Sequence, residues 1–159
     1  MLLRAYIVYV RPILEYNCVV WSPQLKQDTD CIERVQRRFT KRLPNLRHMS
    51  YDNSLSVLDV PTSELRRLHV DLIWCYQIVF SLVCLNCDDF FEYCPVSTMR
   101  RHPYKLYKKH CNSNVRRNYF SNKMINVWNS LPLTVNFSTL HSFKYSTERV
   151  DFKQFLICN

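Results

Sequence analysis

No glycine occurs anywhere in this chain of 159 residues. At the average usage of roughly 7%, about eleven glycines would be expected in a chain of this length. Glycine-rich phosphate-binding loops are therefore excluded, because they need several glycines at fixed spacing. Turns and helix ends that require a positive φ angle must rely on asparagine and aspartate, or carry strain. The candidates for such positions are Asn45, Asn53, Asp59, Asn86 and Asn112.

The composition is that of a folded chain, with 47% hydrophobic and 14% aromatic residues. The length suggests one domain. Near the N-terminus, the apolar run from Ala5 to Val10 is too short for the core of a secretion signal. The nearest approach to a membrane span, Leu72 to Leu85, falls short of the roughly 18 apolar residues required. We therefore expect an intracellular chain, cytoplasmic or nuclear, with no membrane partner.

Apolar residues recur three and four positions apart along much of the chain, which is the spacing of amphipathic helices. In the segment 28–43, we expect Ile32, Val35, Phe39 and Leu43 to form one buried stripe. Further helices are expected at about residues 12–21, 50–60, 61–85, 118–131 and 138–156. Trp128 lies on the apolar side of its helix, so we expect it in the core.

The pattern changes after Pro95, where residues 104–110 and 115–119 alternate on either side of the break "CNSN". Such alternation is typical of a β-hairpin. The sequence therefore predicts a mainly α fold, an irregular helical bundle of about five to six helices with one small β-hairpin. Its expected segments are a helical segment 1–49, a central helical segment 50–95, and a segment 96–159 with the basic hairpin and the C-terminal helices, together forming one compact unit.

The eight cysteines contain one close pair, Cys84 and Cys87. A zinc site usually needs two closely spaced ligand pairs that converge on one point. The neighbouring candidates for a second pair, His110 and Cys111, are adjacent and point apart in an extended chain. We therefore expect no metal site, and we expect the cysteines to be thiols because the chain has no secretion signal.

Asp88 and Asp89 are adjacent carboxylates, a residue type that binds Mg²⁺. A two-metal polymerase site needs its carboxylates on rigid strands, whereas these two follow a helical segment and precede Phe90 and Phe91. They are better explained as the cap of a short helix. No serine, histidine or cysteine lies in a recognisable nucleophile motif. The sequence thus predicts no catalytic residue, no cofactor and no small-molecule substrate.

Lysine and arginine outnumber aspartate and glutamate by 22 to 13, which gives a formal net charge of +9 and favours a polyanionic partner. The densest basic cluster lies in residues 31–48. There Asp30 and Glu33 stand four positions before Arg34 and Arg37, so some of the charge is paired on the helix itself. The remaining basic residues, which we expect to contact nucleic-acid phosphates, are Arg38, Lys41, Arg42 and Arg47. The alternative is a solvated helix face.

A second basic cluster surrounds the expected hairpin and consists of Arg100, Arg101, Lys105, Lys108, Lys109, Arg116 and Arg117. Tyr104 and Tyr107 lie among these residues and are candidates for stacking on unpaired bases. The alternative is a solvated ribbon whose tyrosines are half-buried.

Six sequence words occur in a fixed order along the chain: "VRPILEYNCVVWSP", "IERVQRRFTKRLPNLRHMSY", "LRRLHVDLIWCYQI", "DDFF", "YKL" and "RRNYFSNKMINVWNSLP". In this order they resemble the C-terminal part of LINE-type, jockey-like non-LTR retrotransposon reverse transcriptases, over residues 2–143. The resemblance implies that 1–49 is thumb-like and that the chain derives from the thumb and the region after it, which lie against the template–primer duplex. It also implies that the catalytic aspartates lie upstream, since Asp88 and Asp89 match the word "DDFF" and not the catalytic motif.

The family commonly has glycine where this chain has Asn45, Asp59, Val70 and Arg101, and this difference suggests a drifting copy of such an element. The resemblance therefore predicts a non-catalytic fragment of an RNA-directed DNA polymerase that retains sequence-independent binding to RNA, DNA or a hybrid duplex. Two alternatives stay open. The chain is a small structural or protein-interaction domain with incidental charge, or a decayed copy without a selected function.

Overall fold

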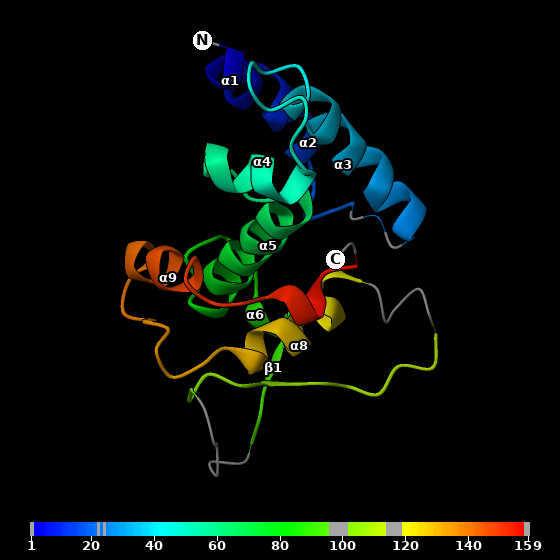
Figure 1. Ribbon diagram of the computed structural model, residues 1–159. Helices are drawn as coiled ribbons and strands as arrows, with labels where there is room; N and C mark the ends of the chain where they lie inside the picture. The colour runs from blue at the N-terminus through cyan, green and yellow to red at the C-terminus, as the bar shows by residue number, and fades with distance from the viewer. Residues whose placement is uncertain (1, 22, 24, 96–101, 114–118, 158–159) are drawn as a thin grey trace. The chain divides into compact units, whose positions relative to one another are not determined.

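The computed structural model describes residues 2–21, 23, 25–95, 102–113 and 119–157, and it confirms a mainly helical fold with one small antiparallel sheet (Figure 1). None of the described helices is both long and apolar enough to cross a membrane. In chain order the elements are α1 (Leu2–Ala5), the π-helix η1 (Tyr6–Val10), α2 (Arg11–Glu15), α3 (Lys26–Thr40), α4 (Tyr51–Leu58), α5 (Ser63–Val79), α6 (Cys87–Phe90), β1 (Glu92–Tyr93), β2 (Leu106–Tyr107), α8 (Phe120–Ser130), α9 (Leu140–Thr147) and the 3-10 helix η2 (Lys153–Phe155).

Hydroxyl side chains begin several of these helices. The Ser50 hydroxyl accepts a hydrogen bond from the backbone N–H of Asn53 at the start of α4. Thr139 does the same for the N–H of Ser142 at the start of α9, over 3.1 Å. Such caps satisfy N–H groups that have no partner within the helix. Of the two residues that the sequence offers as the cap of α4, Ser50 and Asp52, the structure has Ser50, and the expected start of α5 after Pro61 is confirmed.

Positive φ angles occur at four described residues, none of them glycine: Asn17, Asn45, Asp59 and Ser81. The predictions for Asn45 and Asp59 are therefore confirmed. The other three candidates adopt ordinary conformations among the described residues: Asn53 is helical within α4, Asn86 has a φ of −74°, and Asn112 is not among the positive-φ residues. Asn17 and Ser81 were not anticipated.

The chain forms two compact units, and the boundary between them falls inside α5. The first unit comprises Met1–Leu68 and Leu156–Asn159, and the second comprises His69–Phe155. The buried apolar side chains of the first unit are Tyr6, Cys18, Leu43, Leu46, Leu55, Val60 and Leu68. The three-segment division expected from the sequence stays a prediction.

An aromatic cluster forms the core of the second unit. Trp128 is completely buried and donates a hydrogen bond from its Nε1 to the carbonyl oxygen of Tyr104, over 2.6 Å. Its ring centroid lies 5.5 Å from that of Phe137 and 5.7 Å from that of Phe143. The expected core position of Trp128 is thus confirmed.

The small sheet pairs β1 with β2, in the register Glu92 with Tyr107 and Tyr93 with Leu106. This differs from the expected partner of residues 104–110, which was the segment 115–119, and residues 114–118 lie outside the described part of the chain. The contacts of Leu106 hold β2 beside α8. Its side chain is buried, and its backbone N–H and carbonyl bond to the side-chain amide of Asn129 on α8, over 3.0 and 2.8 Å.

Candidate nucleic-acid interface

Helix α3, which carries the first basic cluster, buries polar side chains. The side chains of Thr29, Glu33, Gln36 and Thr40 are buried, and Gln36 is only 1% exposed. The predicted apolar stripe is wrong at Val35, which is 39% exposed. Ile32 and Phe39 are half-buried, and Leu43 is the one member of the stripe that is fully buried.

A hydrogen-bond network makes this polar burial possible. The Oε1 atom of Gln36 accepts hydrogen bonds from the Tyr6 and Ser63 hydroxyls, both with a donor–acceptor distance of 3.0 Å. The Nε2 atom of Gln36 donates a hydrogen bond to the carbonyl of Pro61. The Glu33 carboxylate accepts hydrogen bonds from the backbone N–H of Ser63, at 3.0 and 3.3 Å, and from the Tyr51 hydroxyl. Because the buried polar groups of Glu33 and Gln36 have partners, α3 can turn this side inward.

The two tyrosines of this network remain hydrogen-bond donors at neutral pH. Burial raises the pKa of Tyr6 to about 12, and the negative charge of Glu33 adds to the effect. Burial and the hydrogen bond to Glu33 raise the pKa of Tyr51 in the same direction. The guanidinium of Arg37 lies 4.8 Å from the centre of the Tyr51 ring. Instead of the expected ion pair with Arg37, the Glu33 carboxylate accepts hydrogen bonds from the Tyr51 hydroxyl and the Ser63 N–H.

With its polar side held inward, α3 directs its basic residues to solvent. Arg38 and Lys41, at the end of the helix, are exposed, as are Arg42 and Arg47 in the loop that follows. Within the described residues, none of these four side chains forms an ion pair with an acidic residue. We call this set (Arg38, Lys41, Arg42 and Arg47) the basic loop.

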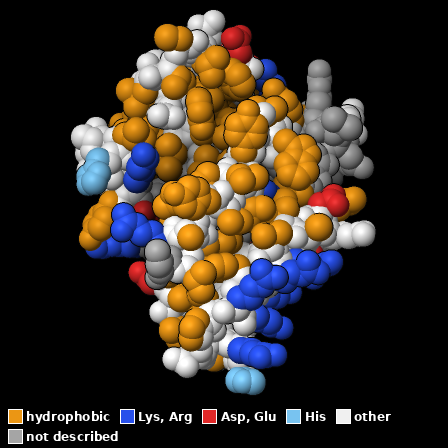
Figure 2. Space-filling view, turned by 90° about the horizontal axis from the view of Figure 1, so that it is seen from above, with side chains coloured by type: hydrophobic (Ala, Val, Ile, Leu, Met, Phe, Trp, Pro, Cys, Tyr) orange, Lys and Arg blue, Asp and Glu red, His pale blue; other side chains and the backbone are white. Residues whose placement is uncertain are grey.

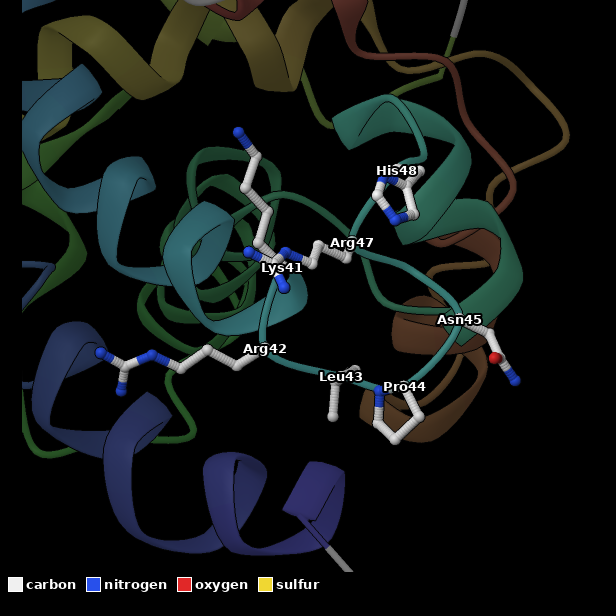
Figure 3. Close-up of a pocket in the computed structure, with 7 residues that line it drawn as sticks. All are labelled: Lys41, Arg42, Leu43, Pro44, Asn45, Arg47 and His48. Atoms are coloured by element: carbon white, nitrogen blue, oxygen red, sulfur yellow. The ribbon is translucent and has the colours of Figure 1, made fainter.

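The basic loop has a defined backbone. The buried side chains of Leu43 and Leu46 anchor it, and Asn45 turns the chain at a φ of 67°. An open pocket of about 680 Å³ is lined by Lys41, Arg42, Leu43, Pro44, Asn45, Arg47 and His48. In the view of Figure 3 the side chains of Lys41, Arg42 and Arg47 extend toward one side of the loop, whereas Asn45 points away from them. Several cationic groups thus gather at one place without a countercharge from the described chain.

The second basic cluster has a different surrounding. Arg100, Arg101, Arg116 and Arg117 lie outside the described residues. Lys105 is half-buried, and the Nζ of Lys108 donates to Asn126 over 2.9 Å. Lys109 forms an ion pair with Glu92, at 2.5 Å, and lines a pocket of about 420 Å³ together with Asp88 and Asp89. Acidic groups therefore offset part of the positive charge here.

The two candidate stacking tyrosines differ in exposure. The ring of Tyr104 is half-buried, and its centroid lies 5.0 Å from that of Phe80 and 5.2 Å from that of Phe137. Tyr107 is exposed and lines the pocket beside Asp88. Tyr107 is therefore the residue whose ring has a free surface for a base.

The described residues contain no group of three or more histidine, cysteine, aspartate or glutamate side chains placed to hold a metal ion. None of the described cysteines forms a disulfide. Asp88 and Asp89 lie in the first turn of the short helix α6, so the expected short helix is confirmed. The expectation that these two residues cap a helix carrying both Phe90 and Phe91 is wrong, because the N-cap residue is Asn86 and Phe91 already has an extended conformation.

The sequence reasoning missed the network of Tyr6, Glu33, Gln36, Tyr51 and Ser63. A signal was present, because Thr29, Glu33, Gln36 and Thr40 recur at helical spacing and all can form hydrogen bonds.

Comparison with models of protein families, with curated proteins and with solved structures finds no match to this chain.

Proposed function

We propose that this chain is a non-catalytic, sequence-independent nucleic-acid-binding fragment derived from the C-terminal region of a retrotransposon RNA-directed DNA polymerase. It acts in the cytoplasm or nucleus and binds the phosphates of RNA, DNA or a hybrid duplex. The observation that carries this proposal is the basic loop, whose four exposed cations have no acidic partner within the described residues.

The physical argument rests on the repulsion between like charges. The hydrogen bonds of α3 and the buried leucines Leu43 and Leu46 fix the backbone on which Lys41, Arg42 and Arg47 stand. Cations held near one another in this way repel, and a phosphate chain relieves the repulsion while releasing its own counterions. Contacts of this kind carry no sequence information, because every nucleotide has the same phosphate.

The basic loop is a better phosphate site than the described part of the second cluster. Lys109 already pairs with Glu92, and Lys108 is hydrogen-bonded to Asn126. A polyanion at that place would also approach Asp88 and Asp89, which line the same pocket as Lys109. We therefore assign the main phosphate contacts to the basic loop and a stacking contact to Tyr107.

The test is a salt titration of the affinity for duplex DNA of unrelated sequences. The variant Arg38→Gln, Lys41→Gln, Arg42→Gln removes three positive charges from the basic loop. The matched control Lys26→Gln, Lys144→Gln, Lys153→Gln removes the same charge from exposed positions elsewhere. On B-DNA, the slope of log affinity against log salt is about −0.9 per phosphate contacted, so the loop variant should be flatter by up to about three units.

The control triple should keep a slope close to that of the wild type, and thermal melts should show that all three proteins fold. Equal slopes for the loop variant and the wild type would contradict the proposal. So would an equal loss of slope in both triple variants, because that would reflect net charge alone.

A further inference from the structure

The N-terminal helical run, α1, η1 and α2, exposes an apolar side. Tyr6 and Arg11 are buried on one side of the run. Tyr9, Ile13 and Tyr16 stand four and three positions apart and are between 71% and 80% exposed. Tyr9 belongs to η1 and Ile13 to α2, and Tyr16 directly follows α2 with a non-helical ψ of 129°. In an isolated protein, such exposed positions would normally carry polar residues.

Other apolar residues of the N-terminal 25 residues are also exposed. Leu2, Val8, Val20, Trp21 and Leu25 are each more than half exposed. Figure 2, seen from above the N-terminal helices of Figure 1, shows hydrophobic side chains gathered over a broad area. We call the set of Leu2, Val8, Tyr9, Ile13, Tyr16, Val20, Trp21 and Leu25 the apolar face.

The area of the apolar face is close to what a stable protein contact needs. At about 200 Å² for a fully exposed aromatic side chain, Tyr9, Tyr16 and Trp21 expose on the order of 400 Å². The five aliphatic side chains add on the order of 300 Å². Specific protein–protein contacts bury about 800 Å² per partner, whereas the largest apolar patch of a typical monomer is about 300–600 Å².

The charges near the apolar face point to what covers it. Between Ala5 and Trp21 the only charged residues are Arg11 and Glu15. Arg11 Nε lies 3.6 Å from Glu15 Oε1, and Arg66 donates a hydrogen bond to Glu15 Oε2 over 3.0 Å. The guanidinium of Arg67 lies 5.9 Å from the centre of the Trp21 ring and donates a hydrogen bond to the carbonyl of Leu14 over 2.6 Å. These arginines are held by partners within the first unit, whereas the exposed Arg4 falls between Leu2 and Val8 in the sequence. Most of the positive charge near the apolar face is therefore already paired and is a weak attraction for a polyanion or an anionic membrane.

We propose that the apolar face is the contact surface of a symmetric homodimer. A two-fold contact places the same patch of both copies together, so an apolar surface whose neighbouring arginines are mostly paired suits it, and the contact closes at two copies. This inference is independent of nucleic-acid binding, because it involves none of the residues of the basic loop.

Sedimentation equilibrium of the full chain, over protein concentrations from about 1 to 100 μM, tests the proposal. We expect the mass to approach twice 19.3 kDa, with a dissociation constant that is micromolar or tighter. The variant Ile13→Glu, Val20→Glu places two charges in the apolar face and should raise the dissociation constant more than about 30-fold. The matched control Val57→Glu, Leu133→Glu changes two other exposed apolar residues and should leave it unchanged.

Circular dichroism melts at low concentration separate loss of association from loss of fold, because Ile13 and Val20 are exposed and contribute little to the core. A wild-type chain that stays monomeric at the highest concentration would overturn the proposal. Assemblies with a mass larger than that of a dimer would show that the contact is not a closed two-fold one, and would also overturn the proposal. A monomer that binds vesicles of anionic lipid, and loses this binding in the Ile13→Glu, Val20→Glu variant, would assign the apolar face to a membrane instead.

Discussion

Asn17, Asn45, Asp59 and Ser81 adopt the left-handed backbone conformation that glycine adopts most easily. Asparagine and aspartate tolerate this conformation better than most residues, because their short polar side chains can bond locally. Asp59 combines this conformation with an unfavourable charge. It ends α4 at a φ of 51°, and its carboxylate stands at the negative end of the helix dipole.

We predict that Asp59→Gly stabilises the protein by about 0.5–1 kcal/mol, because it relieves backbone strain and removes the unfavourable charge. The helix-ending hydrogen bond from the N–H of residue 59 to the carbonyl of Leu55 uses only backbone atoms and should persist. Urea unfolding measures the change in free energy.

Asp52→Gly is the matched control for this substitution. Asp52 lies in the first turn of the same helix, where its charge is favourable and its conformation is helical. The control should therefore lose about 1 kcal/mol. A destabilised Asp59→Gly variant would show that the aspartate at this position makes a stabilising contact.

At the scale of secondary structure, α3 is an amphipathic helix whose buried side is polar. Its contacts replace apolar packing with hydrogen bonds from Tyr6, Tyr51 and Ser63 to Gln36 and Glu33. The ring of Tyr6 also stacks on that of Phe39, with 4.3 Å between centroids. The stability of this helix therefore depends on the satisfaction of a few buried polar groups.

Two adjacent positions of α3 distinguish this arrangement from an apolar stripe. Gln36→Ala should cost about 2–3 kcal/mol, because it leaves the Tyr6 and Ser63 hydroxyls and the Pro61 carbonyl without their partner. Val35→Ala should cost less than about 1 kcal/mol, because the Val35 side chain is exposed. Chemical unfolding of both variants gives the order of the two effects. The reverse order would favour the apolar stripe of Ile32, Val35, Phe39 and Leu43.

The position of α3 was predictable from the sequence, but its orientation was not. Periodicity placed a helix at about 28–43, and the structure has it at Lys26–Thr40. Spacing alone cannot show that Gln36 has partners at positions 6, 61 and 63, because these lie 25 to 30 residues away. The strand partner of Leu106 was missed for the same reason, since Asn129 and β1 are distant in sequence. The exposure of the basic residues in the loop was predictable, because no acidic residue lies near them in the sequence and an unpaired charge is costly to bury.

At the scale of the whole molecule, each compact unit has its own buried side chains. The first unit carries both the basic loop and the apolar face, and the second contains the aromatic cluster around Trp128 and the small sheet. The adjacent acidic residues Asp88 and Asp89 stand on the short helix α6 of the second unit. Nothing in the described residues groups them with a further carboxylate for metal binding.

We predict that the chain does not extend a primer with either Mg²⁺ or Mn²⁺. A two-metal polymerase needs carboxylates from separate rigid elements, and Asp88 and Asp89 lie side by side in one turn of helix. The measurement is primer extension on an RNA and a DNA template, with the Asp88→Ala, Asp89→Ala double variant as control. Extension by the wild type that disappears in the double variant would contradict this prediction.

The absence of glycine also acts on the unfolded chain. A residue with a side chain samples fewer backbone conformations in the unfolded chain than glycine does, so it loses less conformational entropy on folding. Where the native conformation suits the residue, replacing a glycine in this way stabilises the folded state by about 0.4–1 kcal/mol. At Asn17, Asn45, Asp59 and Ser81 the native conformation opposes this gain, but these are only four of the described positions. The denatured ensemble of this chain is consequently stiffer than that of a chain with average glycine content, and its loops close with less loss of disorder.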